Sequence, residues 1–135
     1  MAAKYIHLGR IKTIEEFEEH LKRLQIEIPF DGQIFSGDAQ PLANSYKLPN
    51  GRIIGNRFCV NPMEGWDGTH DGNPTEYVFR RWEKFGQSGA KLIWGGEAFA
   101  VRPDGRANPR QLMLLDSTMK NIEALKSALI SQHRS

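Results

Sequence analysis

Two carboxylates, Glu64 and Glu97, each follow an apolar run and are the residues best placed to do chemistry. The first stands in residues 61–66, NPMEGW, and the second in residues 95–98, GGEA. If both runs are parallel strands, their carboxyl ends meet at one edge of a sheet, where α/β proteins bind their ligands. We therefore expect a ligand site at this edge. On the pattern alone, either carboxylate could instead accept hydrogen bonds that hold a loop end.

Other reactive residue types are present without the spacing that chemistry requires. The loop after the first run carries oxygen side chains at the early positions of a calcium loop, namely Asp67, Thr69 and Asp71, followed by Gly72. The twelfth position is Val78 where a calcium loop needs a bidentate glutamate, so we expect no calcium site. The four histidines lack zinc-ligand spacing, and no metal is predicted. No glycine-rich nucleotide fingerprint follows a strand.

Composition predicts an ordinary globular protein. The 135 residues suffice for one domain, with 39% hydrophobic and 25% charged residues. A net charge of +2 without a basic face argues against nucleic-acid binding.

The single cysteine, Cys59, excludes an internal disulfide and favours a reducing compartment. No run approaches the ~18 apolar residues of a membrane span, and the N-terminus lacks a signal-peptide core. We expect a soluble, cytoplasmic protein.

The two carboxylates require a strand, a helix and a second strand to position them. Residues 57–63 predict the first strand, and Phe58, Cys59 and Val60 read as buried on both faces, which would make the thiol inert. Residues 90–94 predict the second strand. A parallel pair joined by a helix is one β-α-β unit.

The intervening helix is predicted to open at Asn73, with Pro74 in its first turn. Its buried stripe is expected to comprise Val78, Trp82 and Phe85. Arg80, Arg81 and Lys84 are expected to face outward. Gly86 and Gly89 are expected to end it.

Three further elements flank this unit. A helix over residues 13–25 is predicted from a capping box at Thr13 and Glu16. A hairpin is predicted from residues 43–48 and 52–55 around Asn50-Gly51. Residues 102–110 are expected to form a surface loop. A last helix is expected from 116–117 to about 132, with a buried stripe of Ile122, Leu125 and Leu129.

The strand from Asn56 to Met63, NRFCVNPM, resembles the Asn-Arg-Ile/Val-x-x-Ala/Ser-Pro-Met strand of the old yellow enzyme family, the FMN-dependent NADH:flavin oxidoreductases. The similarity continues through residues 71–75, 89–93, 97–101 and 103–109 in the same order. The resemblance implies an α/β fold: the N-terminal part of a (β/α)8 TIM barrel, comprising its first two βα units. A helix and a barrel-capping β-hairpin would precede them. Residues 1–41 would be an N-terminal extension and residues 42–135 the barrel portion.

The resemblance also implies a function and a site. Hydride would pass from NAD(P)H to FMN and then to a small electron-poor acceptor such as an activated alkene. By position, Asn61, Pro62, Met63 and Glu64 would lie along the flavin ring, Ala98 would contribute from the second strand, and Trp66 would lie near the substrate. No catalytic residue is assigned. Glu64 departs from the family, in which Thr or Cys is commoner at that position, and a carboxylate there would disfavour the anionic reduced flavin.

Chain length leaves other interpretations open. A complete barrel needs roughly 250 residues, and this chain supplies two βα units. It could be one piece of a split barrel that needs the remaining half, or it could self-associate. It could also be a truncated, non-catalytic remnant or an interaction module.

Overall fold

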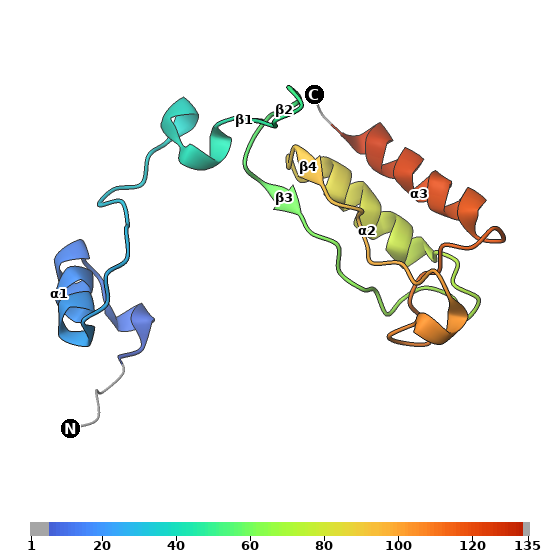
Figure 1. Ribbon diagram of the computed structural model, residues 1–135, viewed down its shortest axis with the longest axis horizontal. Coiled ribbons are helices and arrows are strands. Elements are labelled where there is room, and N and C mark those ends of the chain that lie inside the picture. Colours follow the sequence, from blue (N-terminus) through green and yellow to red (C-terminus); the bar gives the residue numbers. More distant parts are fainter. Residues whose placement is uncertain (1–5, 134–135) are drawn as a thin grey trace. The chain divides into compact units, whose positions relative to one another are not determined.

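The computed structural model describes residues 6–133, apart from the side chain of Asp38 (Figure 1). The chain divides into two compact units, one ending at Ser36 and one starting at Gly37. None of the helices in the described range combines the length and hydropathy that a bilayer span requires.

The N-terminal unit contains a short 3-10 turn, η1 (Leu8–Arg10), and helix α1 (Ile14–Leu24). The predicted capping box is confirmed. Glu16 N donates to Thr13 Oγ1 at 3.2 Å, and Thr13 N donates to Glu16 Oε2 at 3.4 Å. The helix ends where Gln25 adopts a left-handed conformation, φ +55°.

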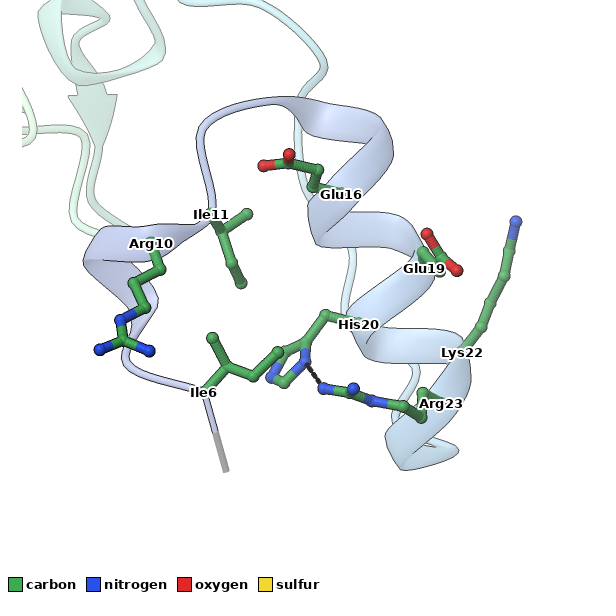
Figure 2. A pocket seen from close by; sticks show the side chains of 8 residues that line it. All are labelled: Ile6, Arg10, Ile11, Glu16, Glu19, His20, Lys22 and Arg23. Atoms are coloured by element: carbon green, nitrogen blue, oxygen red, sulfur yellow. Dashed lines mark hydrogen bonds between the residues drawn. The ribbon is translucent and has the colours of Figure 1, made fainter. Parts of the chain in front are cut away.

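A cavity of about 770 Å³ lies between η1 and α1 (Figure 2). Its lining comprises Ile6, Arg10, Ile11, Glu16, Glu19, His20, Lys22 and Arg23. His20 is buried, and its Nδ1 lies 2.7 Å from Arg23 Nη2. Because a guanidinium only donates, this Nδ1 is the acceptor. The lining mixes both charge signs and includes none of the site residues expected from the sequence.

The second unit opens with two short 3-10 turns, η2 (Gly37–Ala39) and η3 (Pro41–Ala43), and the predicted hairpin follows. Strand β1 (Tyr46–Lys47) pairs antiparallel with β2 (Ile53–Ile54), with Tyr46 opposite Ile54. Gly51 takes the positive φ, +85°, that the turn requires.

Strand β3 (Cys59–Val60), helix α2 (Glu76–Gln87) and strand β4 (Leu92–Ile93) follow in order. The two strands are parallel, with Cys59 opposite Leu92, so the β-α-β prediction is confirmed. The described residues form two two-stranded sheets and no closed barrel.

The prediction that β3 is buried on both faces is wrong. Phe58 is 50% exposed, and Cys59 is also exposed. Successive side chains along a strand point to opposite faces, so the exposure of both Phe58 and Cys59 means that no packed layer covers either face at this end of β3 in the described part of the chain.

The core of this unit lies between α2 and helix α3 (Met119–Gln132), which run side by side (Figure 1). Val78, Trp82, Leu112 and Leu125 form the buried cluster, and Phe79, Phe85, Phe99, Ile122 and Leu129 pack around it. The apolar stripes expected on both helices therefore face this core. Full burial of each large apolar side chain contributes about 1.5–3 kcal/mol.

Three predicted helix boundaries are wrong. The N-cap of α2 is Thr75, because Asn73 is held elsewhere: its N–H donates to Thr69 Oγ1 at 2.8 Å and its Nδ2 to Asp71 at 2.8 Å. Gly86 lies inside α2, where an added Cβ would come 2.3 Å from Leu129 O of α3, so this glycine permits close helix packing. Helix α3 begins at Met119, after Thr118, whose buried hydroxyl donates to Met113 O at 2.6 Å.

Candidate functional site

The carboxyl ends of β3 and β4 lie side by side, as the sequence predicts. Trp94 N donates to Val60 O at 2.9 Å, and beyond the strands Met63 and Glu97 form an isolated parallel bridge. Ala98 N donates to Met63 O at 3.2 Å. The segments 61–64 and 97–98, separated by more than 30 positions in the sequence, are thus in direct contact.

A groove of about 710 Å³ opens at this edge, and we call it the strand-end groove. It is lined by Val60, Asn61, Met63, Glu64, Gly65, Trp66, Asp67, Arg81, Phe85, Gly96 and Glu97. Its volume falls within the range of about 300–1,000 Å³ that is usual for small-molecule sites. Of the six residues that the resemblance assigns to the flavin or the substrate, four line this groove: Asn61, Met63, Glu64 and Trp66. Glu97, the second carboxylate expected at this edge, also lines it.

Pro62 and Ala98, also expected there, are not part of the lining. Pro62 is exposed. Both backbone groups of Ala98 are engaged, because its N–H donates to Met63 O and its carbonyl accepts from Gln111 Nε2 at 3.0 Å. Ala98 thus retains only its methyl group for contact with a ligand.

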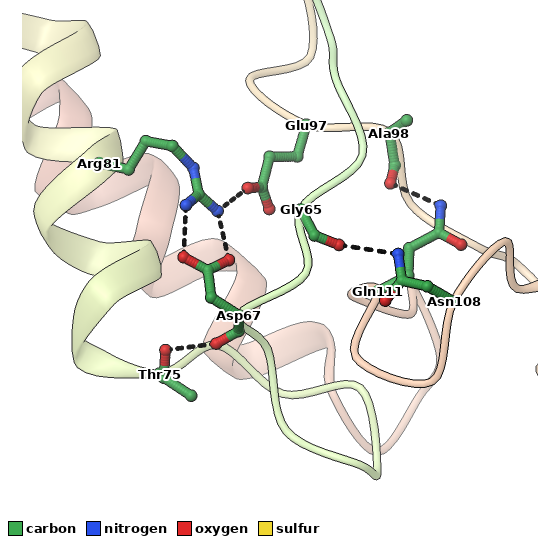
Figure 3. A network of polar contacts seen from close by, with 8 residues as sticks. All are labelled: Gly65, Asp67, Thr75, Arg81, Glu97, Ala98, Asn108 and Gln111. Atoms are coloured by element: carbon green, nitrogen blue, oxygen red, sulfur yellow. Dashed lines mark hydrogen bonds and ion pairs between the residues drawn. The ribbon is translucent and has the colours of Figure 1, made fainter.

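One wall of the groove is an ion cluster of Arg81, Asp67 and Glu97, the Arg81 cluster (Figure 3). Arg81 binds both oxygens of Asp67, at 2.5 and 2.8 Å, and its Nη2 also donates to Glu97 Oε1. The prediction that Arg81 faces outward is wrong. Arg81 is three residues after Val78 and four before Phe85, so helical spacing places it beside the buried stripe, and its guanidinium reaches the strand ends.

Glu97 was expected as an unpaired carboxylate, and that expectation is wrong for one of its oxygens. Its side chain is only 2% exposed, and Oε1 is held by Arg81. Oε2 is buried without a hydrogen-bond partner among the described residues, as is Trp82 Nε1. Burial raises the pKa of Glu97 although Arg81 opposes the shift, whereas the hydrogen bonds from Arg81 lower the pKa of Asp67. These same bonds, those to Asp67 first, raise the pKa of Arg81.

Two glycines let the chain pass close to this wall. A Cβ at Gly65 would lie 2.8 Å from Glu97 Oε1 and 2.9 Å from Arg81 Nη2. Gly96 has φ +72°, and a Cβ there would lie 2.6 Å from the Trp82 ring. Any larger residue at either position would collide with the groups that define the groove.

Two polar side chains behind the groove were not anticipated. Asn108 and Gln111 are buried, and Asn108 Nδ2 donates to Gly65 O at 3.0 Å, while Gln111 holds Ala98 (Figure 3). The expectation that residues 102–110 form a surface loop is therefore wrong at Asn108. The one available signal was the apolar run from Leu112 to Leu115, which directly follows these residues.

The calcium-loop residues serve the loop itself. Thr69 Oγ1 donates to Asp71 at 2.5 Å, and Asp67 belongs to the Arg81 cluster. In residues 6–133, no three His, Cys, Asp or Glu side chains gather as a metal site would require. Cys59, expected to be buried, is exposed, and its Sγ contacts Asn61 Oδ1 at 3.4 Å.

No protein-family model matches this sequence, and no curated protein matches it either. The geometry therefore carries the functional argument. The strand-end groove offers aromatic and apolar surface from Trp66, Phe85 and Met63, beside carboxylates that accept hydrogen bonds. Such a site can hold a planar ring and orient it.

Proposed function

We propose that this chain is the N-terminal part of an FMN-dependent oxidoreductase barrel of the old yellow enzyme type. In this proposal the strand-end groove holds one side of the flavin ring. Bound FMN would supply hydride transfer from NAD(P)H to an electron-poor acceptor such as an activated alkene. A cytoplasmic location accompanies the proposal, because a single cysteine suits a reducing compartment.

The observation that supports it most is the contact between Met63 and the segment Glu97–Ala98. The resemblance requires residues 61–64 and 98 to act on one ligand, and the Ala98 N to Met63 O bond of 3.2 Å joins them. The parallel pairing of β3 and β4 brings the two strand ends together, and this bond fixes which of their residues lie side by side.

The groove fits the ring better than the rest of the cofactor. Asn61, Met63 and Glu64 would lie along the ring, and Trp66 offers an exposed aromatic face. Arg81 is the only basic residue in the lining, and both Asp67 and Glu97 already bind it. In this proposal the lining contacts and orients the ring, and it offers no basic side chain for the phosphate.

The test is a titration of FMN with the full chain, in which the quenching of flavin fluorescence measures binding. Trp66 and Trp94 form a matched pair, because they are 65% and 63% exposed and only Trp66 lines the groove. Trp66→Ala should weaken binding at least fivefold, since loss of stacking on an aromatic side chain costs about 1–3 kcal/mol. Trp94→Ala should leave it unchanged. Absence of FMN binding to the wild-type chain, or equal losses in both variants, would refute the proposal.

One observation favours the second candidate, an interaction module or one piece of a split barrel. Phe58, Ile53 and Trp94 expose 50%, 68% and 63% of their surface on the second unit. Ile53 lies in β2, whereas Phe58 precedes β3 and Trp94 follows β4. Each of the two sheets has only two strands in the described range, and exposed apolar side chains beside unpaired strand edges favour association with another chain. Light scattering over a concentration series tests self-association, and a constant monomer mass would exclude it.

A further inference from the structure

We propose that the strand-end groove discriminates between ligands by charge, binding a planar ring more tightly when the ligand is uncharged or cationic than when it is anionic, with Glu64 setting the preference. The inference builds on the proposed flavin site and specifies which ligands that site takes. It rests on the charges of the lining and on its aromatic side chains.

The charged residues of the lining are three carboxylates and one guanidinium: Glu64, Asp67, Glu97 and Arg81. The bidentate bond between Asp67 and Arg81 pairs those two charges. Glu97 shares the same guanidinium, and Glu64 forms no ion pair within the described range. With all four groups ionised, the lining carries a net charge of two negative. An anionic ligand therefore meets repulsion and no available cation.

The aromatic side chains of the lining also favour an uncharged or cationic ligand. The face of an aromatic ring is negative, so Trp66 and Phe85 attract a cation and stack on a neutral ring. Within the flavin proposal, uncharged riboflavin should consequently bind at least as well as FMN, whose phosphate is anionic.

The experiment compares riboflavin and FMN by fluorescence quenching at low ionic strength. We expect riboflavin to bind about threefold to tenfold more tightly, with the ratio shrinking towards one in high salt, where exposed charges are screened. Glu64→Gln should reduce the ratio of riboflavin affinity to FMN affinity at low salt. Glu123→Gln, an equal charge change on an exposed residue of α3 outside the lining, should preserve it. Tighter binding of FMN, or an equal effect of both variants, would overturn the inference.

A flavin-independent pair of probes separates this inference from the proposed function. Benzamidine, a cation, and benzoate, an anion, have rings of the same size, and tryptophan fluorescence of the wild-type chain and of Trp66→Phe reports contact with Trp66. If neither flavin binds, the proposed function fails for this chain, while binding of benzamidine in preference to benzoate upholds charge selection. Equal binding of both probes, or binding of neither, overturns it.

Discussion

Arg81→Met tests whether the Arg81 cluster holds the strand-end groove together. Methionine keeps most of the apolar stem and removes the guanidinium, which leaves Asp67 and Glu97 without their shared cation. Removing one partner of a fully buried ion pair costs about 3–5 kcal/mol. Arg81 and Asp67 are about one third exposed, so the loss of their ion pair contributes little to this free-energy cost. Glu97, only 2% exposed, carries most of the cost, and we expect a loss of about 2–4 kcal/mol of unfolding free energy.

The loss should depend on pH, with a sign set by the two carboxylates. Burial already raises the pKa of Glu97 in the folded protein, and the variant loses Arg81, the strongest interaction that opposes that shift. A group whose folded pKa lies above its unfolded value stabilises fully at low pH and loses that contribution as pH rises through the folded pKa. Asp67 has the opposite pH dependence, because its pKa is lowered in the folded protein. Its ionised carboxylate stabilises the wild type, and this stabilisation is lost as pH falls through the folded pKa. The deficit of the variant should therefore grow from pH 5 to pH 7.5.

Urea unfolding followed by tryptophan fluorescence at both pH values measures this. Arg80→Met is the matched control, because it removes the same charge one position away, where the exposed guanidinium lies over the Tyr77 ring. We expect it to lose less than about 1 kcal/mol. Adding Glu97→Gln to Arg81→Met should recover part of the stability, since the uncompensated charge is gone. If Arg81→Met and Arg80→Met lose the same amount at both pH values, the cluster does not stabilise the fold as described.

Two glycine substitutions extend the test to packing. Gly86→Ala should destabilise the protein by about 1–2 kcal/mol, because the clash with Leu129 O at 2.3 Å outweighs the gain of about 1 kcal/mol in helix propensity; a higher melting temperature would contradict this packing. Gly65→Ala should displace Arg81 from Glu97 and weaken flavin binding more than it lowers stability. Calorimetry beside the FMN titration separates these effects, and unchanged FMN affinity would show that Gly65 does not shape the groove.

Local sequence signals were sufficient for the elements and their order. The Asn50-Gly51 turn predicts the hairpin, and the Thr13–Glu16 capping box predicts the start of α1. The apolar stripes of α2 and α3 predict their buried faces. Each of these signals spans at most a few turns of chain, and the interactions that produce it are equally local. The resemblance to a flavin barrel and the flavin site itself stay predictions.

The contacts that build the candidate site join distant positions. Arg81 meets partners 14 and 16 residues away, and Asn108 reaches Gly65 across 43 residues. Helical periodicity places an arginine beside a buried stripe, but only the packed fold decides whether it extends into solvent or towards buried carboxylates. The same holds for Cys59, whose apolar neighbours predict burial. The sequence by itself thus determined the elements and the residues at the strand ends. The tertiary structure alone decided which charges pair and which surfaces remain open, because both depend on what the fold brings within a few ångströms.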